Sequence, residues 1–115
     1  MTPYIAKDFR QYLKTNKPVL IAEGYLFEFI RRGRIKAGSN VPEVVLDYPQ
    51  SVRALHQEFV DAGTDVVQAF TYYAHREKMR DVGREDELET INRKALQIAK
   101  EVARENNKLF AGGLL

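Results

Sequence analysis

The sequence predicts an α/β fold in which about three parallel strands alternate with flanking helices. Three short apolar runs carry β-favouring residues, at residues 18–24, 65–70 and 109–111. The segments between these runs place apolar residues at helical spacing. Alternation of this kind is typical of right-handed βαβ units and a parallel sheet. At 115 residues the chain suffices for one domain.

Composition narrows the class of protein. The chain is 44% hydrophobic and 30% charged, as expected for a soluble globular domain. We expect no membrane partner, because no apolar run approaches the length of a membrane span and the N-terminus lacks the apolar core of a signal peptide. A net charge of +2 gives no support for nucleic-acid binding. The absence of cysteine excludes disulfides and thiolate metal sites within this chain and favours a cytoplasmic location.

The first part of the chain predicts a helix and then a buried strand. Residues 1–16 form an N-terminal helical extension, with a helix expected over residues 4–14. Its apolar positions recur every four residues, at Ile5, Phe9 and Leu13. Residues 18–24 follow, and their continuous apolar run is typical of a strand buried on both faces of a sheet.

The middle of the chain predicts two helical segments that flank a long loop. One or two helical turns are expected over residues 25–32, closed by Gly33, and a loop rich in Gly, Ser, Asn and Pro over residues 33–48. Pro49 opens the next helix. Its apolar face contains Val52, Leu55, His56, Phe59 and Val60. His56 lies at the edge of this face, where a structural histidine is expected rather than a ligand.

The last part of the chain predicts the remaining strands and helices. Gly63 ends the preceding helix, and the central strand follows over residues 65–70. A short helix over residues 74–81 and a long helix over residues 85–105 come next. Asn106 and Asn107 end the long helix before the third strand.

Candidate site residues follow two of the predicted strands. Glu23 is the first acid after a buried strand; it belongs either to a site or to a helix N-terminus, where an acid compensates the helix dipole. Tyr72 and Tyr73 follow the central strand, where they either line a pocket or pack against neighbours. His75 is isolated, so no metal site is expected there. A basic cluster is read as a solvated helix end, and it contains Arg31, Arg32, Arg34 and Lys36.

Four stretches, taken together, resemble the homocysteine S-methyltransferase family, and most closely its betaine–homocysteine methyltransferase branch. They occur in the family's order and spacing. They are AEGYLFEFIRRGRIKAG (residues 22–38), VPEVVLDYPQSVRALHQEFVDAGTDVVQAFTYYAHREKM (41–79), INRKALQIAKEVA (91–103) and the terminal AGG (111–113).

The resemblance implies a fold and a chemistry. Family members are (β/α)8 TIM barrels, so residues 1–115 are expected to form the N-terminal fragment of such a barrel and part of its homocysteine-binding domain. The family transfers a methyl group to the homocysteine sulfur, which gives methionine. It holds zinc through three cysteines late in the barrel, and zinc keeps that thiol as the nucleophilic thiolate. This chain has no cysteine, so the zinc ligands are absent from it.

The resemblance also assigns substrate-binding roles. The family's first strand usually ends D-G-G, and its acid and glycine contact the amino-acid end of homocysteine. This chain has Ala22-Glu23-Gly24 there, so Glu23 is offset by one place if Gly24 matches the second glycine. The resemblance thus implies that Glu23, Gly24 and Tyr25 bind substrate. Tyr72 and Tyr73 match the aromatic pair that lines the methyl-donor pocket, where ring faces attract a quaternary ammonium such as betaine's. The betaine branch has a tryptophan at the position of Asn40, and this chain has none, which leaves S-methylmethionine or another sulfonium open as donor. No catalytic residue is assigned.

Two hypotheses of different classes follow. In the first, the chain is the N-terminal part of a zinc-dependent S-methyltransferase and is inactive in isolation. In the second, it is a truncated, non-catalytic interaction module derived from that barrel, which self-associates through exposed strand edges.

Overall fold

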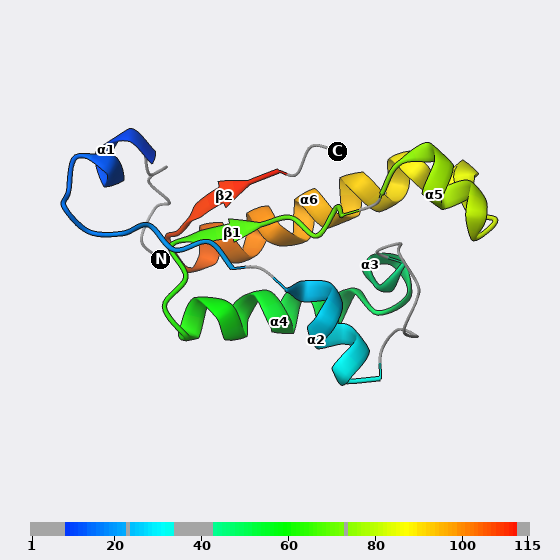
Figure 1. Ribbon diagram of the computed structural model, residues 1–115, viewed down its shortest axis with the longest axis horizontal. Coiled ribbons are helices and arrows are strands. Elements are labelled where there is room, and N and C mark those ends of the chain that lie inside the picture. The colour runs from blue at the N-terminus through cyan, green and yellow to red at the C-terminus, as the bar shows by residue number, and fades with distance from the viewer. Residues whose placement is uncertain (1–8, 23, 34–42, 73, 113–115) are drawn as a thin grey trace.

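The computed structural model describes residues 9–22, 24–33, 43–72 and 74–112 and shows a small parallel sheet with helices around it (Figure 1). The described elements, in chain order, are α1 (Phe9–Leu13), α2 (Tyr25–Arg31), α3 (Val44–Asp47), α4 (Pro49–Asp61), β1 (Val66–Gln68), α5 (Arg76–Asp81), the 3-10 helix η1 (Glu85–Glu87), α6 (Leu88–Glu105) and β2 (Leu109–Ala111). The predicted mixture of helices and parallel strands is therefore confirmed.

The sheet has two strands rather than the three that were predicted. β1 and β2 pair in parallel, with Val66 opposite Leu109. The expected strand at residues 18–24 contributes only an isolated parallel bridge between Ile21 and Val66. Leu20 and Ile21 are 53% and 48% exposed, so the expectation of burial on both faces is wrong. The predicted parallel direction is correct, but within the described residues the segment has a strand, β1, on one side only.

Hydrogen bonds of Leu20 with Asp65 and Val66 fix the segment before this bridge. The Leu20 amide donates to Asp65 Oδ2 at 2.9 Å. In return, the Asp65 and Val66 amides donate to the Leu20 carbonyl at 2.9 and 3.1 Å. Leu20 is thus joined by three hydrogen bonds to residues 45 and 46 positions later in the chain, next to β1.

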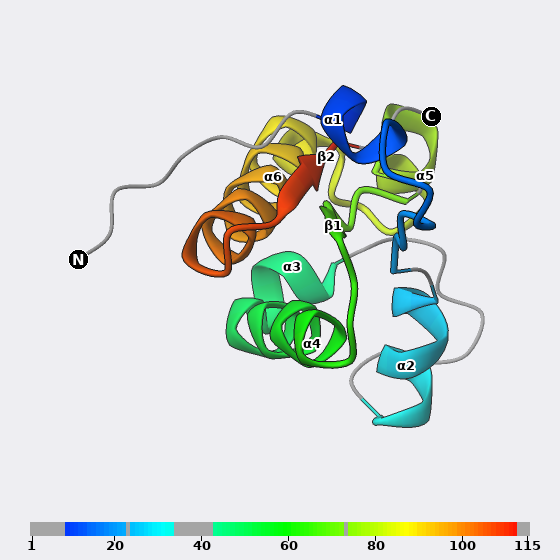
Figure 2. The same ribbon diagram turned by 90° about the vertical axis from the view of Figure 1, so that its left-hand side faces the viewer.

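Helices α4 and α6 run beside the sheet along its length (Figures 1 and 2). The small residues Ala99 and Ala103 of α6 are fully buried, which lets the helix approach the sheet closely. One apolar cluster joins both helices to β1, and its members are Val60, Val67, Ala69, Ala99, Val102 and Ala103. The helical spacing predicted for residues 85–105 is confirmed, because the apolar positions of α6 from Ile91 to Val102 are buried.

The segment between residues 33 and 48 contains a helix that the loop prediction missed. α3 begins at Val44 and buries Val44 and Val45 almost completely. Its four residues are too few to show helical periodicity, and the Gly and Pro residues before it dominated the prediction. The long helix also begins later than predicted, because Glu85–Glu87 form η1 before α6 starts at Leu88.

The structure describes the predicted N-terminal helix only from Phe9 onward, because residues 1–8 lie outside the described residues. α1 spans Phe9–Leu13 and buries none of its residues. Its position near the amino ends of the strands is clear in Figure 1. Among the helices that the structure describes, none combines the length and the apolar character needed to cross a membrane.

Candidate functional site

Two adjacent parallel segments deliver their following residues to the same edge of the sheet. The Ile21 bridge and β1 run in the same direction, so Gly24 and Tyr72 both follow the carboxyl ends of neighbouring segments. This edge is where parallel α/β folds place their sites. Two other predicted site residues, Glu23 and Tyr73, lie outside the described residues.

Gly24 makes the turn from the first segment into α2. Its φ of 82° lies in the left-handed region, which glycine adopts without the steric penalty of a Cβ atom. The Glu28 amide donates to the Gly24 carbonyl at 3.1 Å and so starts the helix. The turn needs glycine for its backbone, which is a reason for Gly24 independent of any ligand.

Tyr25 forms the centre of an aromatic cluster beneath this edge. Its side chain is buried, and its ring lies 5.0 Å from His56, 5.1 Å from Phe59 and 5.7 Å from Phe70, measured between ring centroids. Phe70 also contacts Phe29. Since Phe70 lies two residues before Tyr72, the cluster forms a rigid apolar base for the segment that carries Tyr72.

A buried polar pair lies inside this cluster. The Tyr25 Oη atom lies 3.2 Å from His56 Nδ1, and the phenol also forms a hydrogen bond with the backbone of Gln68. Burial raises the pKa of Tyr25 well above its ordinary value, and the Gln68 contact lowers it by less. Burial lowers the pKa of His56 to about 4, so its imidazole is neutral at pH 7. The expectation of a structural histidine is supported by this burial and bonding.

The segment from Thr71 to Ala74 forms a hydrogen-bonded turn. The Thr71 amide donates to the Ala69 carbonyl at 3.0 Å, and the Ala74 amide donates to the Thr71 carbonyl at 2.9 Å. Thr71 and Ala74 are buried, whereas Tyr72 is 49% exposed. The turn therefore presents the Tyr72 side chain at the surface while both of its ends are fixed.

Asn92, on α6, forms a hydrogen bond with the backbone at the end of this turn. Its Nδ2 atom donates to the Ala74 carbonyl at 2.9 Å and to the Leu88 carbonyl at 3.0 Å. Asn92 lies in the family-like stretch at residues 91–103. Its contact with residue 74, 18 positions away, has no local sequence signal.

The charged residues around the site are paired with one another. Arg31 and Arg32 form ion pairs with Glu28, and Arg32 also pairs with Glu58 at 2.6 Å. These two arginines therefore behave as the predicted solvated helix end, while Arg34 and Lys36 lie outside the described residues. Arg84 joins α3 to η1 by pairing with Asp47 at 3.0 Å and with Glu87. Hydrogen bonding to Glu87 and then to Asp47 raises the pKa of Arg84.

The described residues do not fit a metal centre. Across the parts of the chain that the structure describes, no three His, Asp or Glu side chains gather closely enough to hold a metal ion. The sequence supplies no cysteine. His56 is occupied through Nδ1 by Tyr25.

Comparison with known proteins adds sequence evidence to this geometry. The sequence model of the homocysteine S-methyltransferase family matches residues 10–114. An S-methylmethionine–homocysteine S-methyltransferase of Rattus norvegicus is 39% identical over 112 residues, which cover 97% of this chain and 30% of that protein. Betaine–homocysteine S-methyltransferase 1 of Xenopus tropicalis is 37% identical over 112 residues, which cover 94% of this chain and 28% of that protein.

A solved structure shows the same fold. The metallated homocysteine methyltransferase of Escherichia coli superposes with a TM-score of 0.72 and 20% identity, over 90% of this chain and 39% of that one. The chain thus spans less than a third of the length of the two curated relatives above. Because the family match extends over nearly every residue of the chain, this protein belongs to the homocysteine S-methyltransferase family.

Proposed function

We propose that this chain supplies the part of a homocysteine S-methyltransferase barrel that faces homocysteine and the methyl donor. The observation that carries the proposal is the parallel bridge between Ile21 and Val66, which brings Gly24 and Tyr72 to one edge of the sheet. In this proposal the chain is the N-terminal portion of a (β/α)8 barrel. The Ile21 segment, β1 and β2 are its first three consecutive strands.

The proposed roles divide between the two ends of the site. Glu23 and Gly24 hold the amino-acid end of homocysteine, with Tyr25 packed beneath them. Tyr72 and Tyr73 face the methyl donor, because an onium cation is attracted to aromatic ring faces by roughly 0.5–2 kcal/mol per contact. Betaine and S-methylmethionine, named in the relatives, both carry such a cation.

Binding of a donor can be tested on the chain itself. We expect millimolar betaine or S-methylmethionine to shift the NMR signals of the Tyr72 ring, and Tyr72→Ala to abolish the response at the neighbouring Thr71 and Ala74 amides. Tyr48 is a matched control, since it is 48% exposed and lies outside the proposed pocket. Equal shifts at Tyr48 and Tyr72 would indicate unspecific binding and contradict the proposal.

The proposal further holds that the methyl transfer needs zinc, bound by cysteines that this chain does not contain. A homocysteine thiol near its ordinary pKa is mostly protonated at neutral pH and reacts slowly. The purified chain with zinc, homocysteine and betaine should therefore yield no methionine above the uncatalysed level. Turnover at enzymatic rates would disprove the need for a cysteine-bearing remainder.

A second candidate function is a non-catalytic interaction module of the same origin. The exposed apolar residues along both sheet edges favour it: Leu20 and Ile21 on one side, and Phe110, at 39% exposure, on the other. A stable dimer with protected strand amides would favour this module, whereas unspecific aggregation would favour an incomplete barrel.

A further inference from the structure

We infer that Asn92 is a positioning residue that sets the orientation of the turn carrying Tyr72. The inference rests on the proposed function only for the identity of the ligand. The structural part concerns a single side chain that connects the rigid helix α6 to the turn after β1, and it can be tested separately.

The contacts of Asn92 use both hydrogens of its amide group. One goes to the Leu88 carbonyl in its own helix and fixes the side chain against α6. The other goes to the Ala74 carbonyl at the end of the turn. Because both partners are carbonyl oxygens, only the amide nitrogen can face them, and this sets the orientation of the amide group.

The helix behind Asn92 is a firm support. The preceding residue, Ile91, is fully buried, and so is Ala95 one turn later. Both belong to the same apolar cluster as Phe70 and Ala74, so the start of α6 and the base of the turn share one packed core. A hydrogen bond from this point of α6 therefore transmits the position of the helix to the turn.

Two other hydrogen bonds of the turn are local. The Ala74 amide donates to the Thr71 carbonyl and the Thr71 amide donates to the Ala69 carbonyl, so these two bonds do not tie the turn to a different element. The Asn92 bond is the side-chain link from α6 to the backbone at Ala74. We therefore expect its loss to release the turn while the core stays folded.

The test compares Asn92→Ala and Asn92→Asp with Asn106→Ala. Aspartate keeps the shape of asparagine but cannot donate at neutral pH, so both Asn92 variants should lose the bond. Asn106 is a matched control, since its Nδ2 atom likewise donates to a carbonyl four residues earlier, Val102, at 2.8 Å, far along the helix from the turn. If Asn92→Ala fails to fold, Asn92→Asp carries the test.

The readouts are amide hydrogen exchange and betaine titration, both followed by NMR. We expect Ala74 exchange to become at least about tenfold faster in both Asn92 variants while the core amide of Ile98 is unchanged. We also expect the Tyr72 response to betaine to weaken severalfold. Asn106→Ala should change neither the Ala74 exchange nor the betaine response.

The outcomes separate this inference from the proposed function. If Ala74 exchange is unchanged, or rises only in step with Ile98, Asn92 has a general structural role and the inference is wrong. If the native chain shows no Tyr72 response to betaine or S-methylmethionine, the proposed donor site is wrong. In that second case, selective loss of Ala74 protection would still support Asn92 as the residue that positions the turn.

Discussion

At the scale of single residues, the most unusual environment is that of the Tyr25–His56 pair. His56 is 1% exposed, and its Nε2 atom has no hydrogen-bond partner among the described residues. A buried polar atom without a hydrogen-bond partner costs free energy, so packing alone would not favour a histidine at this buried position. The sequence placed His56 at the edge of an apolar face. Its full burial became evident only from the position of α2 over α4.

The depressed pKa of His56 predicts a loss of stability in mild acid. Unfolding restores an ordinary imidazole, which binds a proton below about pH 6.5, whereas the folded protein does not until its pKa of about 4. The free energy of unfolding should therefore fall by about 2 kcal/mol between about pH 7.5 and pH 5. Urea denaturation at both pH values measures the difference.

A matched variant isolates the histidine in that experiment. The paired carboxylates Glu28, Glu58 and Glu85 have lowered pKa values, so they lose their folded-state advantage only as the pH falls below the ordinary carboxyl range. His56→Gln should consequently flatten the dependence between pH 7.5 and pH 5. An equal slope in this variant would show that another group titrates there.

Removing the Tyr25 hydroxyl should destabilise the chain. Tyr25→Phe leaves the ring in place but deprives His56 Nδ1 and the Gln68 backbone of a partner. The expected cost is about 1–3 kcal/mol in the free energy of unfolding, measured by urea denaturation. Tyr48→Phe, at a half-exposed position, should cost less than about 0.5 kcal/mol. Equal effects would contradict a role for the buried pair.

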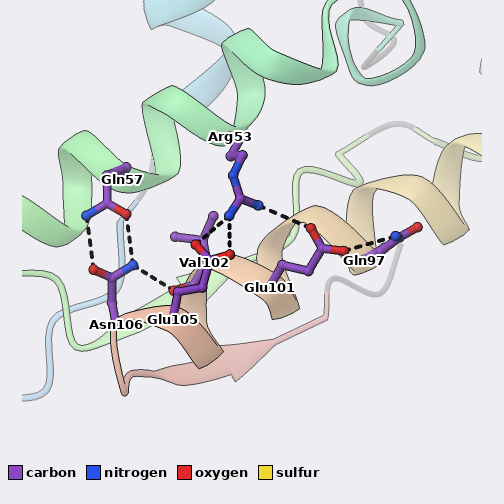
Figure 3. Close-up of polar contacts among 7 residues, drawn as sticks. All are labelled: Arg53, Gln57, Gln97, Glu101, Val102, Glu105 and Asn106. Carbon is purple, nitrogen blue, oxygen red and sulfur yellow. Dashed lines mark hydrogen bonds and ion pairs between the residues drawn. The ribbon is translucent and has the colours of Figure 1, made fainter. Parts of the chain in front are cut away.

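At the scale of elements, polar contacts between α4 and α6 fix the pair of helices that supports the sheet (Figure 3). The Gln57 and Asn106 amides bond to each other reciprocally, at 3.0 and 2.8 Å. Arg53 reaches Glu101 at 3.1 Å and also pairs with Glu105. The amide pair is partly buried and its geometry is mutual, whereas the carboxylates of the ion pairs are about half exposed.

This difference predicts unequal contributions to stability. A double-mutant cycle of Gln57→Ala and Asn106→Ala should give a coupling energy of about 0.5–1.5 kcal/mol. Arg53→Ala should cost no more than about 1 kcal/mol, and the cost should shrink in high salt. A coupling energy near zero would show that water replaces the amide pair. Gln97→Ala, which loses a bond within α6 only, is the control.

The elements also show how far sequence reasoning extended. A short run of β-favouring apolar residues predicted the segment of β1 correctly, and apolar periodicity predicted α4 and α6, because each of these elements buries apolar residues. Periodicity failed for α3, which is shorter than two helical turns. The apolar run failed for the strand at residues 18–24, since the degree of pairing depends on the neighbours a segment finds and not on its own composition.

At the scale of the whole molecule, the sequence predicted the parallel direction of the segments that precede Gly24 and Tyr72, but not the contacts that support these residues. Parallel order alone brings Gly24 and Tyr72 to one edge, so that prediction needed only the direction of two segments. The Tyr25–His56 pair joins positions 31 apart, and the bond from Asn92 to Ala74 joins positions 18 apart. Such contacts follow from tertiary packing, which no local pattern contains.

The free sheet edges predict concentration-dependent association, in keeping with the second candidate function. Phe110→Lys should weaken association, because a charge on an edge strand opposes pairing with another chain. Phe27→Lys is the control, since Phe27 is 75% exposed on α2, away from the strands. Sedimentation velocity across a concentration series measures the change. Equal effects of the two variants would indicate unspecific hydrophobic contact.

The hydrogen-bonded contact between Leu20 and Asp65 affects the expected order of folding. It closes a loop across 45 positions, and the entropy of ordering so long a loop must be offset by three hydrogen bonds and one bridge. The contacts between α4 and α6 close stretches of similar length, since Arg53 and Glu101 lie 48 positions apart, but these helices and the strands bury far more apolar surface than Leu20 and Ile21, which are about half exposed. The N-terminal segment should therefore dock last and detach first, which makes the homocysteine-facing end of the proposed site the least persistent part of the molecule.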